Sequence, residues 1–228
     1  MFPELARHIL TSEWKEKGNH PIIALEGPVC AGKSSLLRKV EAKKAAIVIP
    51  EYSEYLGCVE RPTSRFPAAT RDEAMANFNQ FLEIEKKRKE LLDNSGPSIK
   101  YLDRSVFTLL AFELGVSCLT GIDIYRWALG HVADNPNVIV PDHVLYLDVS
   151  RIVAMSRAKA ANMRTPLFMF SDNFNARARA FFTALNTTIP GYVSFINANE
   201  NEEGVYNQFN QASGRWQVGP LRHGANLH

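Results

Sequence analysis

The most informative segment of this chain reads Gly27-Pro28-Val29-Cys30-Ala31-Gly32-Lys33-Ser34, a G-x-x-x-x-G-K-S pattern. An apolar run precedes it and a helix-like run follows it, which is the strand–loop–helix context in which this motif binds phosphate. Glycines let successive backbone N–H groups point at a phosphate, and the helix N-terminus adds the positive end of its dipole. The segment therefore predicts a nucleoside triphosphate site with contacts from Gly27 to Ser35. Lys33 would reach the β- and γ-phosphates, and Ser34 would ligate Mg²⁺.

Short apolar runs alternate with helical patterns along the whole chain, which predicts a parallel sheet covered by helices. The expected strands are 21–26, 46–49, 99–102, 144–147 and 192–196. The expected helices are 3–17, 34–40, 70–94, 104–115, 121–133, 150–162, 171–186 and 201–211. The third of these helices opens with a capping box, Thr70-x-x-Glu73. With no repeat or linker, we expect one domain over 1–228 in which 1–18 is an N-terminal helical extension.

The composition is that of a globular chain, with 46% hydrophobic and 22% charged residues among 228. A net charge of +2 is too small to indicate a polynucleotide or membrane partner. Cys30, Cys58 and Cys118 are widely spaced, which favours reduced thiols over a disulfide frame or zinc site. No apolar run has membrane-spanning length and no secretory signal opens the chain, so we expect a cytoplasmic protein. Scattered histidines give no indication of a transition-metal site.

Carboxylates follow the second and third expected strands, on the side of the sheet where the phosphate-binding loop lies. Glu51 could accept a proton from a substrate hydroxyl there. Asp103 is placed as a Mg²⁺-side carboxylate, and Arg104 as a clamp for a substrate oxygen or phosphate. The alternative for either carboxylate is that it caps the following helix.

The helix after the fourth strand ends in three cations, Arg157, Lys159 and Arg164. Arginines that approach from a mobile segment can neutralise the charge that spreads over a transferring phosphoryl group. We therefore count Arg157 and Arg164 as candidate catalytic residues. A solvated helix with favourable cations at its C-terminal end is the equal alternative.

Three segments resemble known nucleoside and nucleotide kinases. Pro141-Asp142 through Ser150, followed by Arg157, is similar to the P-D-x-x-x-x-L-D-V…R stretch of thymidylate kinases. Asp103-Arg104-Ser105 resembles their D-R-[YS] motif and equally the [DE]-R-S motif of deoxyribonucleoside kinases. The loop around Ala198 resembles the segment that touches adenine in both families. These similarities occur in matching order from about residue 20 to residue 212.

The resemblance implies a doubly wound, five-stranded parallel sheet flanked by helices, with a short helical lid at about 157–170. It also implies ATP with Mg²⁺ as donor and a nucleoside or nucleoside monophosphate as acceptor. Pro50-Glu51-Tyr52 is closer to the P-E-P-x-x-x-W of deoxyribonucleoside kinases, in which the glutamate deprotonates the 5′-hydroxyl, than to the E-P-G-G of thymidylate kinases. The second proline and the tryptophan are absent, however, so the phosphorylation state of the acceptor stays open.

The long helix over 70–94 carries the candidate acceptor-binding residues. Helical spacing places Asn77, Gln80, Phe81, Ile84 and Arg88 near one face, while Glu83–Lys87 and Glu85–Lys89 have the spacing of ion pairs on a solvated face. Phe78 or Phe81 could stack on a base and Gln80 could read its edge. The resemblance to thymidylate kinases implies that Arg88 holds a substrate phosphate. The alternative is that the aromatic residues are core and that Arg88 extends its head to solvent.

The long loop over 51–69 adds further candidates to the acceptor site, since long loops at strand ends tend to bind ligands. These candidates are Tyr52, Tyr55, Arg61, Arg65 and Arg71. We therefore predict an ATP-dependent kinase that acts on a small-molecule acceptor, a nucleoside or nucleoside monophosphate, with a lean toward a deoxypyrimidine type. The alternatives are a P-loop NTPase that hydrolyses or senses nucleotide while binding a partner, and a same-fold kinase for a non-nucleoside metabolite or a modified base in DNA. Both resembled families often dimerise through helices, so a homodimer is also open.

Overall fold

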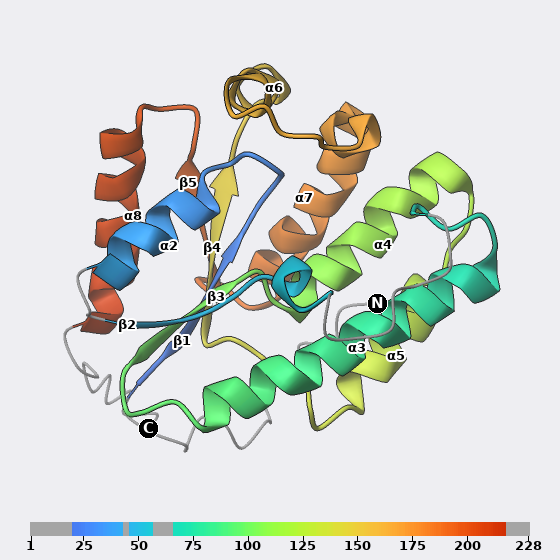
Figure 1. Cartoon of the computed structure of the whole chain (residues 1–228), viewed down its shortest axis with the longest axis horizontal. Coiled ribbons are helices and arrows are strands. Elements are labelled where there is room, and N and C mark those ends of the chain that lie inside the picture. Colours follow the sequence, from blue (N-terminus) through green and yellow to red (C-terminus); the bar gives the residue numbers. More distant parts are fainter. Residues whose placement is uncertain (1–19, 43–45, 57–65, 218–228) are drawn as a thin grey trace, which may run out of the picture.

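The computed structural model describes residues 20–42, 46–56 and 66–217. The expected helix at 3–17, the candidates Arg61 and Arg65, and the tail beyond 217 lie outside these residues. The five strands are β1 (Ile22–Glu26), β2 (Ala46–Ile49), β3 (Ile99–Asp103), β4 (His143–Asp148) and β5 (Val193–Asn197). They form one parallel sheet in the order β2-β3-β1-β4-β5, which confirms the predicted fold class (Figure 1).

Helices cover both faces of the sheet (Figure 1). The α-helices are α2 (Lys33–Ala42), α3 (Arg71–Asp93), α4 (Val106–Thr120), α5 (Tyr125–Ala133), α6 (Arg151–Ala160), α7 (Asp172–Thr188) and α8 (Glu202–Gln217). Of two short 3₁₀ helices, η2 (Tyr52–Tyr55) lies within the long loop expected over 51–69, and η3 (Leu167–Phe170) lies within the segment expected as a helical lid. β1 is an almost continuous apolar run because it is central and covered on both faces.

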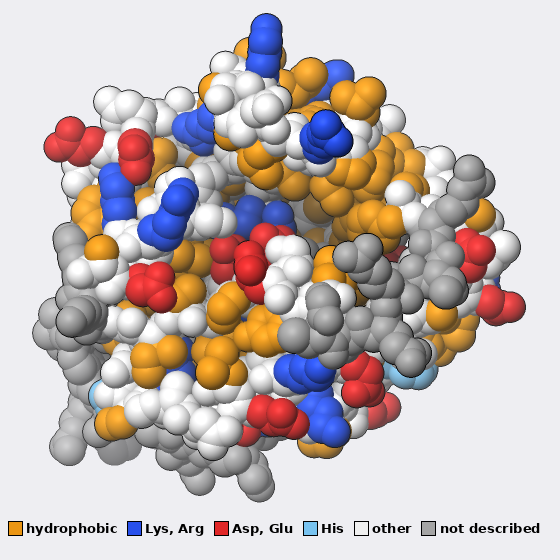
Figure 2. Space-filling model, viewed as in Figure 1, with side chains coloured by type: hydrophobic (Ala, Val, Ile, Leu, Met, Phe, Trp, Pro, Cys, Tyr) orange, Lys and Arg blue, Asp and Glu red, His pale blue; other side chains and the backbone are white. Residues whose placement is uncertain are grey.

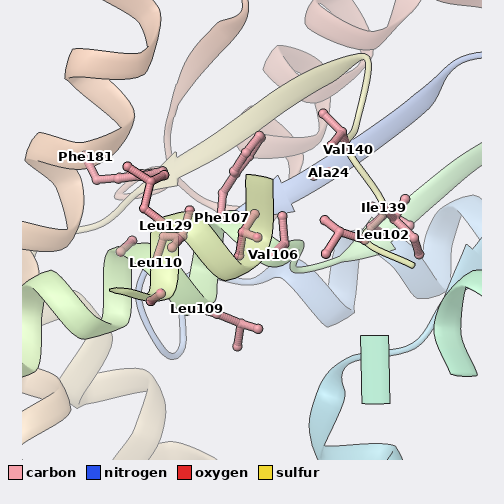
Figure 3. Close-up of a cluster of buried hydrophobic side chains, with 14 of the residues drawn as sticks. Ala24, Leu102, Val106, Phe107, Leu109, Leu110, Leu129, Ile139, Val140 and Phe181 are labelled. Carbon is pink, nitrogen blue, oxygen red and sulfur yellow. The ribbon is translucent and has the colours of Figure 1, made fainter. Parts of the chain in front are cut away.

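Two hydrophobic cores lie on the two faces of the sheet. The larger core joins α3, α4, α5 and α7 to the sheet, and Val106, Phe107 and Leu110 of α4 are fully buried within it (Figure 3). The smaller core joins α2, α6 and α8 to the opposite face through residues such as Leu37 and Phe209. This arrangement leaves the carboxyl edge of the sheet between the two layers for a binding site.

Local capping interactions set where the helices begin. Thr70 accepts a hydrogen bond from the Glu73 N–H at 3.2 Å, as the capping box predicts, while the Glu73 carboxylate accepts from the Ala69 N–H at 2.8 Å. Ser105 accepts from the Phe107 N–H at 3.2 Å, so α4 begins two residues later than expected. Within the described ranges, no helix combines the length and the apolar character needed to span a bilayer.

The register of the sheet brings the predicted site residues to one edge. Leu25 of β1 lies opposite Asp103 of β3, and Ile49 of β2 lies opposite Leu102. The phosphate-binding loop that follows β1 therefore lies next to Asp103 and to Glu51, which comes two residues after the end of β2. Parallel strands that end at one level produce this convergence from residues far apart in sequence.

Candidate active site

The phosphate-binding loop connects β1 to α2 by a sharp turn at Gly27, whose φ is +128°. A Cβ atom at this position would lie 2.4 Å from the Leu147 carbonyl oxygen of β4, so the loop packs directly on the neighbouring strand. Lys33 is buried at the start of α2, and its Nζ donates to the carbonyl oxygens of Gly27 at 3.1 Å and Pro28 at 2.8 Å. Burial, followed by the charge of Arg104, lowers the pKa of Lys33 to about 8.

Gly27→Ala is expected to lower the free energy of unfolding by roughly 2–6 kcal/mol, because backbone strain adds to a clash with rigid backbone. Gly121→Ala is the matched comparison, since Gly121 also has a positive φ, +74°, but has no atom within 4 Å of its Cβ position. That variant should lose about 1–2 kcal/mol from the left-handed conformation alone. Denaturant unfolding of both variants measures the difference. Equal losses would show that the loop can move away from Leu147.

Ser34 and Asp103 form the candidate Mg²⁺ site that the sequence predicts. The Ser34 hydroxyl donates to Asp103 Oδ2 at 3.1 Å, so the loop and the end of β3 are in direct contact. Asp103 Oδ1 is buried and has no hydrogen-bond partner among the described residues. A hydroxyl beside a carboxylate with an unused oxygen fits the oxygen ligands that Mg²⁺ prefers. The residues therefore fit the ion, and Mg²⁺ binding itself stays a prediction.

Glu51 and Arg104 form an ion pair next to this position. Arg104 Nε donates to Glu51 Oε1 at 2.7 Å, and Arg104 Nη1 donates to the Gly27 carbonyl at 3.2 Å. Arg104 has a φ of +65°, an uncommon conformation for a non-glycine residue. Burial alone would raise the pKa of Glu51, but the charges of Arg104 and Lys33 outweigh burial and hold this pKa below its ordinary value. Glu51 is therefore an ionised carboxylate beside the phosphate-binding loop.

Glu26 is a site residue that the sequence reasoning missed. This last residue of β1 is fully buried and accepts hydrogen bonds from the Ser105 N–H at 2.8 Å, the Ser105 hydroxyl at 2.6 Å and the Thr108 hydroxyl. Burial raises the pKa of its carboxyl despite these donors. Through these hydrogen bonds, Glu26 holds the start of α4 against the end of β1, where the phosphate-binding loop begins. The signal was available, because a carboxylate ends β1 just as Asp103 ends β3.

Arg88 occupies a position that contradicts its predicted role. Its side chain is 0% exposed and does not line the cavity. Its guanidinium donates to the carbonyls of Pro50 at 3.0 Å, Arg104 at 2.7 Å and Asp103 at 3.2 Å. The prediction that Arg88 binds a substrate phosphate is therefore wrong. Arg88 instead holds together the backbone at the ends of β2 and β3, from which Glu51 and Asp103 project.

Glu85 is the buried counter-ion of Arg88, and its Oε2 accepts from Arg88 Nη1 at 2.8 Å. The same oxygen accepts from the Tyr52 hydroxyl at 2.8 Å, and Oε1 accepts from the Ile139 N–H at 3.1 Å. The predicted Glu85–Lys89 pair on a solvated face is wrong, because Lys89 pairs with Asp93 at 2.9 Å. The Tyr52 ring lines the cavity, whereas its hydroxyl is committed to Glu85.

A cavity of about 900 Å³ extends from the phosphate-binding loop between α3, α4 and the segment 161–169. Figure 2 shows this hollow in the face of the molecule, with charged side chains at its floor and hydrophobic side chains along one wall. Among the α3 candidates, Phe78 and Phe81 line it together with Asn77, whereas Gln80 does not. Tyr55 and Arg71 do not line it either, and Arg71 donates to the Asp123 carbonyl at 2.9 Å.

The three cations predicted after β4 lie in different surroundings. Arg157 donates to the carbonyls of Cys30 at 3.4 Å and Ala31 at 3.3 Å, and to that of Glu200 at 3.2 Å. Arg157 thus joins the phosphate-binding loop to the segment after β5. Arg164 is exposed and lines the cavity, while Lys159 does not. Ala198 is fully buried at the end of β5, and its N–H donates to the Asp148 carbonyl at 2.8 Å.

The sequence matches none of the protein-family models or curated proteins with which it was compared. The structure is similar to that of deoxyadenosine kinase from M. mycoides with products dCMP and a flexible dCDP bound, at 18% identity and a TM-score of 0.63 over 85% of this chain and 99% of that chain. The same kinase with bound dATP gives 17% identity and a TM-score of 0.60, over 84% and 98% of the two chains. With bound dCTP the values are 18% and 0.58, over 85% and 99%. The chain therefore has the fold of these P-loop kinases.

Proposed function

We propose that this chain is an ATP-dependent kinase that transfers the γ-phosphate of ATP to the hydroxyl of a nucleoside. The observation that carries the proposal is the ionised Glu51 carboxylate, held by Arg104 beside the phosphate-binding loop and the Ser34–Asp103 pair. A hydroxyl acceptor needs a base, whereas a phosphate acceptor is already anionic at neutral pH. The burial of Arg88 also takes one of the candidate phosphate-binding arginines away from the cavity. The fold shared with deoxyadenosine kinase supports the same reaction class.

In the proposed reaction, Glu51 takes the proton of the acceptor hydroxyl while the hydroxyl oxygen forms a bond to the γ-phosphorus of ATP. The bond from that phosphorus to the bridging oxygen breaks, and ADP leaves with the electron pair. Ser34 and Asp103 would hold Mg²⁺, which would supply positive charge to the phosphates of the donor. Lys33 would exchange the carbonyls of Gly27 and Pro28 for phosphate oxygens, and the phosphate charge would keep its amine protonated.

We also propose that the segment 157–170 acts as the lid of this site, within one kinase domain in the cytoplasm. Arg157 already contacts the phosphate-binding loop through the carbonyls of Cys30 and Ala31. Arg164 lines the same cavity from the far side of the turn after α6. Both arginines could therefore approach the transferring group without a rearrangement of the sheet.

The proposal is tested by incubation with ATP and Mg²⁺ and a panel of nucleosides and nucleoside monophosphates, with ADP and phosphorylated product measured together. We expect ADP release that depends on a nucleoside and matches formation of its 5′-monophosphate. Lys33→Ala is the control, because activity that belongs to this site must disappear with that amine. ADP release at one rate with every acceptor would identify an NTPase instead. Reaction of monophosphates alone would identify a thymidylate kinase-like enzyme.

A further inference from the structure

Glu113 of α4 is a buried carboxyl that the proposed reaction does not use. The residue is 9% exposed and lines the cavity between Phe112 and Val116, away from the phosphate-binding loop. Among the residues that the structure describes, none donates a hydrogen bond to this carboxyl, and the charged group that affects it is Asp123. Burial, followed by the like charge of Asp123, raises the pKa of Glu113 to about 7. Its carboxyl is therefore available to a ligand in the cavity that carries a hydrogen-bond donor.

The position of Glu113 suits one end of an extended acceptor. The helix cap at Ser105 follows Asp103 and Arg104 directly, and Glu113 comes eight residues later, about 12 Å along the helix axis. A nucleoside has its reactive hydroxyl at one end and the hydrogen-bonding edge of its base at the other. An acceptor whose hydroxyl meets Glu51 would therefore direct its base toward this end of the cavity.

The cavity that Glu113 lines is otherwise mostly apolar on its α3 and α4 sides. Phe78 and Phe81 of α3 and Phe112 of α4 also line the cavity, so most of this region is apolar and aromatic. Among the α3 residues that line the cavity, Asn77 is the polar one. Aromatic walls with few polar groups are typical of sites that hold a planar base and select it by one or two hydrogen bonds.

Resting on the proposed kinase function, we propose that Glu113 is a specificity-determining residue that accepts a hydrogen bond from the exocyclic amino group of the acceptor's base. An ionised carboxylate only accepts hydrogen bonds, so an amino group fits it. A keto oxygen in the same place would meet the carboxylate lone pairs and leave the charge buried and unpaired. The acceptor class is therefore adenine or cytosine nucleosides rather than their keto counterparts. This replaces the general deoxypyrimidine expectation with a choice based on the amino group.

Two pairs of nucleosides test this group. Deoxycytidine and deoxyuridine differ by amino or keto at one carbon and by the hydrogen on the adjacent ring nitrogen, and so do deoxyadenosine and deoxyinosine, so the Glu113→Gln variant is needed to assign the preference to the amino group. At pH 8, above the pKa of about 7, the free protein holds Glu113 in its accepting form. We expect kcat/KM to favour the amino member of at least one pair by at least about 100-fold.

Glu113→Gln supplies the matching variant, because an amide can accept from an amino group and can also donate to a keto oxygen. We expect the preference to fall by at least about 10-fold, through a higher KM for the amino acceptor and a lower KM for the keto acceptor. The unfolding midpoint of the ligand-free variant should equal or exceed that of the wild type, because a buried carboxyl without a donor is removed. Glu83→Gln, on the exposed face of α3, is the control and should keep the wild-type preference.

Each outcome bears on the proposal. A wild-type protein that phosphorylates nucleosides without an amino preference would overturn the role of Glu113 and leave the kinase function intact. The same conclusion follows if Glu113→Gln keeps the preference, or loses it with a midpoint well below that of Glu83→Gln, since the carboxyl would then support packing. If no nucleoside is phosphorylated, the proposed function fails and this inference fails with it.

Discussion

Glu51→Gln should lower kcat for a nucleoside acceptor by about 10²–10⁴-fold, because the amide cannot take the hydroxyl proton. The substitution keeps the shape of the side chain and an oxygen that can accept from Arg104 Nε, so the ion pair becomes a hydrogen bond from the charged guanidinium to a neutral amide. The KM for ATP should change little. Steady-state rates with a saturating nucleoside measure the effect, and Glu54→Gln, an exposed glutamate of η2, is the matched control.

The pH profile provides an independent check on Glu51. The charges of Arg104 and Lys33 overcome the effect of burial and hold the pKa of Glu51 below its ordinary value of 4.5. The base form is therefore present at neutral pH, and its contribution to the rate should be lost only as the pH falls below 4.5. If Glu51→Gln lost less than about 10-fold in rate, no general base would operate and a monophosphate acceptor would be indicated.

Arg88→Met should lower the free energy of unfolding by about 3–5 kcal/mol, because it leaves Glu85 buried without its counter-ion. The variant also removes the donors to the carbonyls of Pro50, Asp103 and Arg104, so Glu51 and Asp103 lose their support. Activity measured well below the unfolding midpoint should therefore fall as well. Denaturant unfolding gives the free energy, and the nucleoside assay gives kcat.

Two further variants separate the buried pair from general damage to α3. Arg88→Met combined with Glu85→Gln should recover part of the stability, because the glutamine carries no charge, its oxygen can still accept from the Ile139 N–H, and its amide nitrogen can donate to the Tyr52 hydroxyl oxygen. Lys89→Met in the same helix breaks a more exposed pair with Asp93 and should cost less than about 1 kcal/mol. Unchanged stability in Arg88→Met, accompanied by a higher KM, would restore the phosphate-binding role for this arginine.

Motifs whose geometry is local were predictable from sequence. The phosphate-binding loop, the capping box at Thr70 and the five strands depend on short-range patterns of glycine, hydrogen-bonding side chains and apolar runs. Strand-end positions also predicted that Glu51 and Asp103 would approach the loop, because parallel strands end at one edge of the sheet. The Ser34–Asp103 contact at 3.1 Å agrees with that reasoning.

Burial of charge could not be predicted, because it depends on which side of a helix the rest of the chain covers. On α3, Glu85 and Lys89 have the spacing of a solvated pair, yet Glu85 faces the core and Lys89 pairs with Asp93. Arg88 has the spacing of a ligand-binding residue and instead satisfies three backbone carbonyls. The burial of Glu85 and Arg88 is stabilised by contacts with the ends of β2 and β3 and with Ile139, which are distant in sequence.

The amino-acid sequence alone determined that a G-x-x-x-x-G-K-S loop follows the first strand of a parallel α/β sheet, since those signals lie within a few neighbouring residues. Only the tertiary structure decided which carboxylates are ionised and which are buried. Glu51 is ionised because Arg104 and Lys33 lie beside it, whereas Glu26 and Glu113 have raised pKa values because packing removes water from them. The charge state of a side chain is set by the dielectric and the neighbours that folding assembles around it.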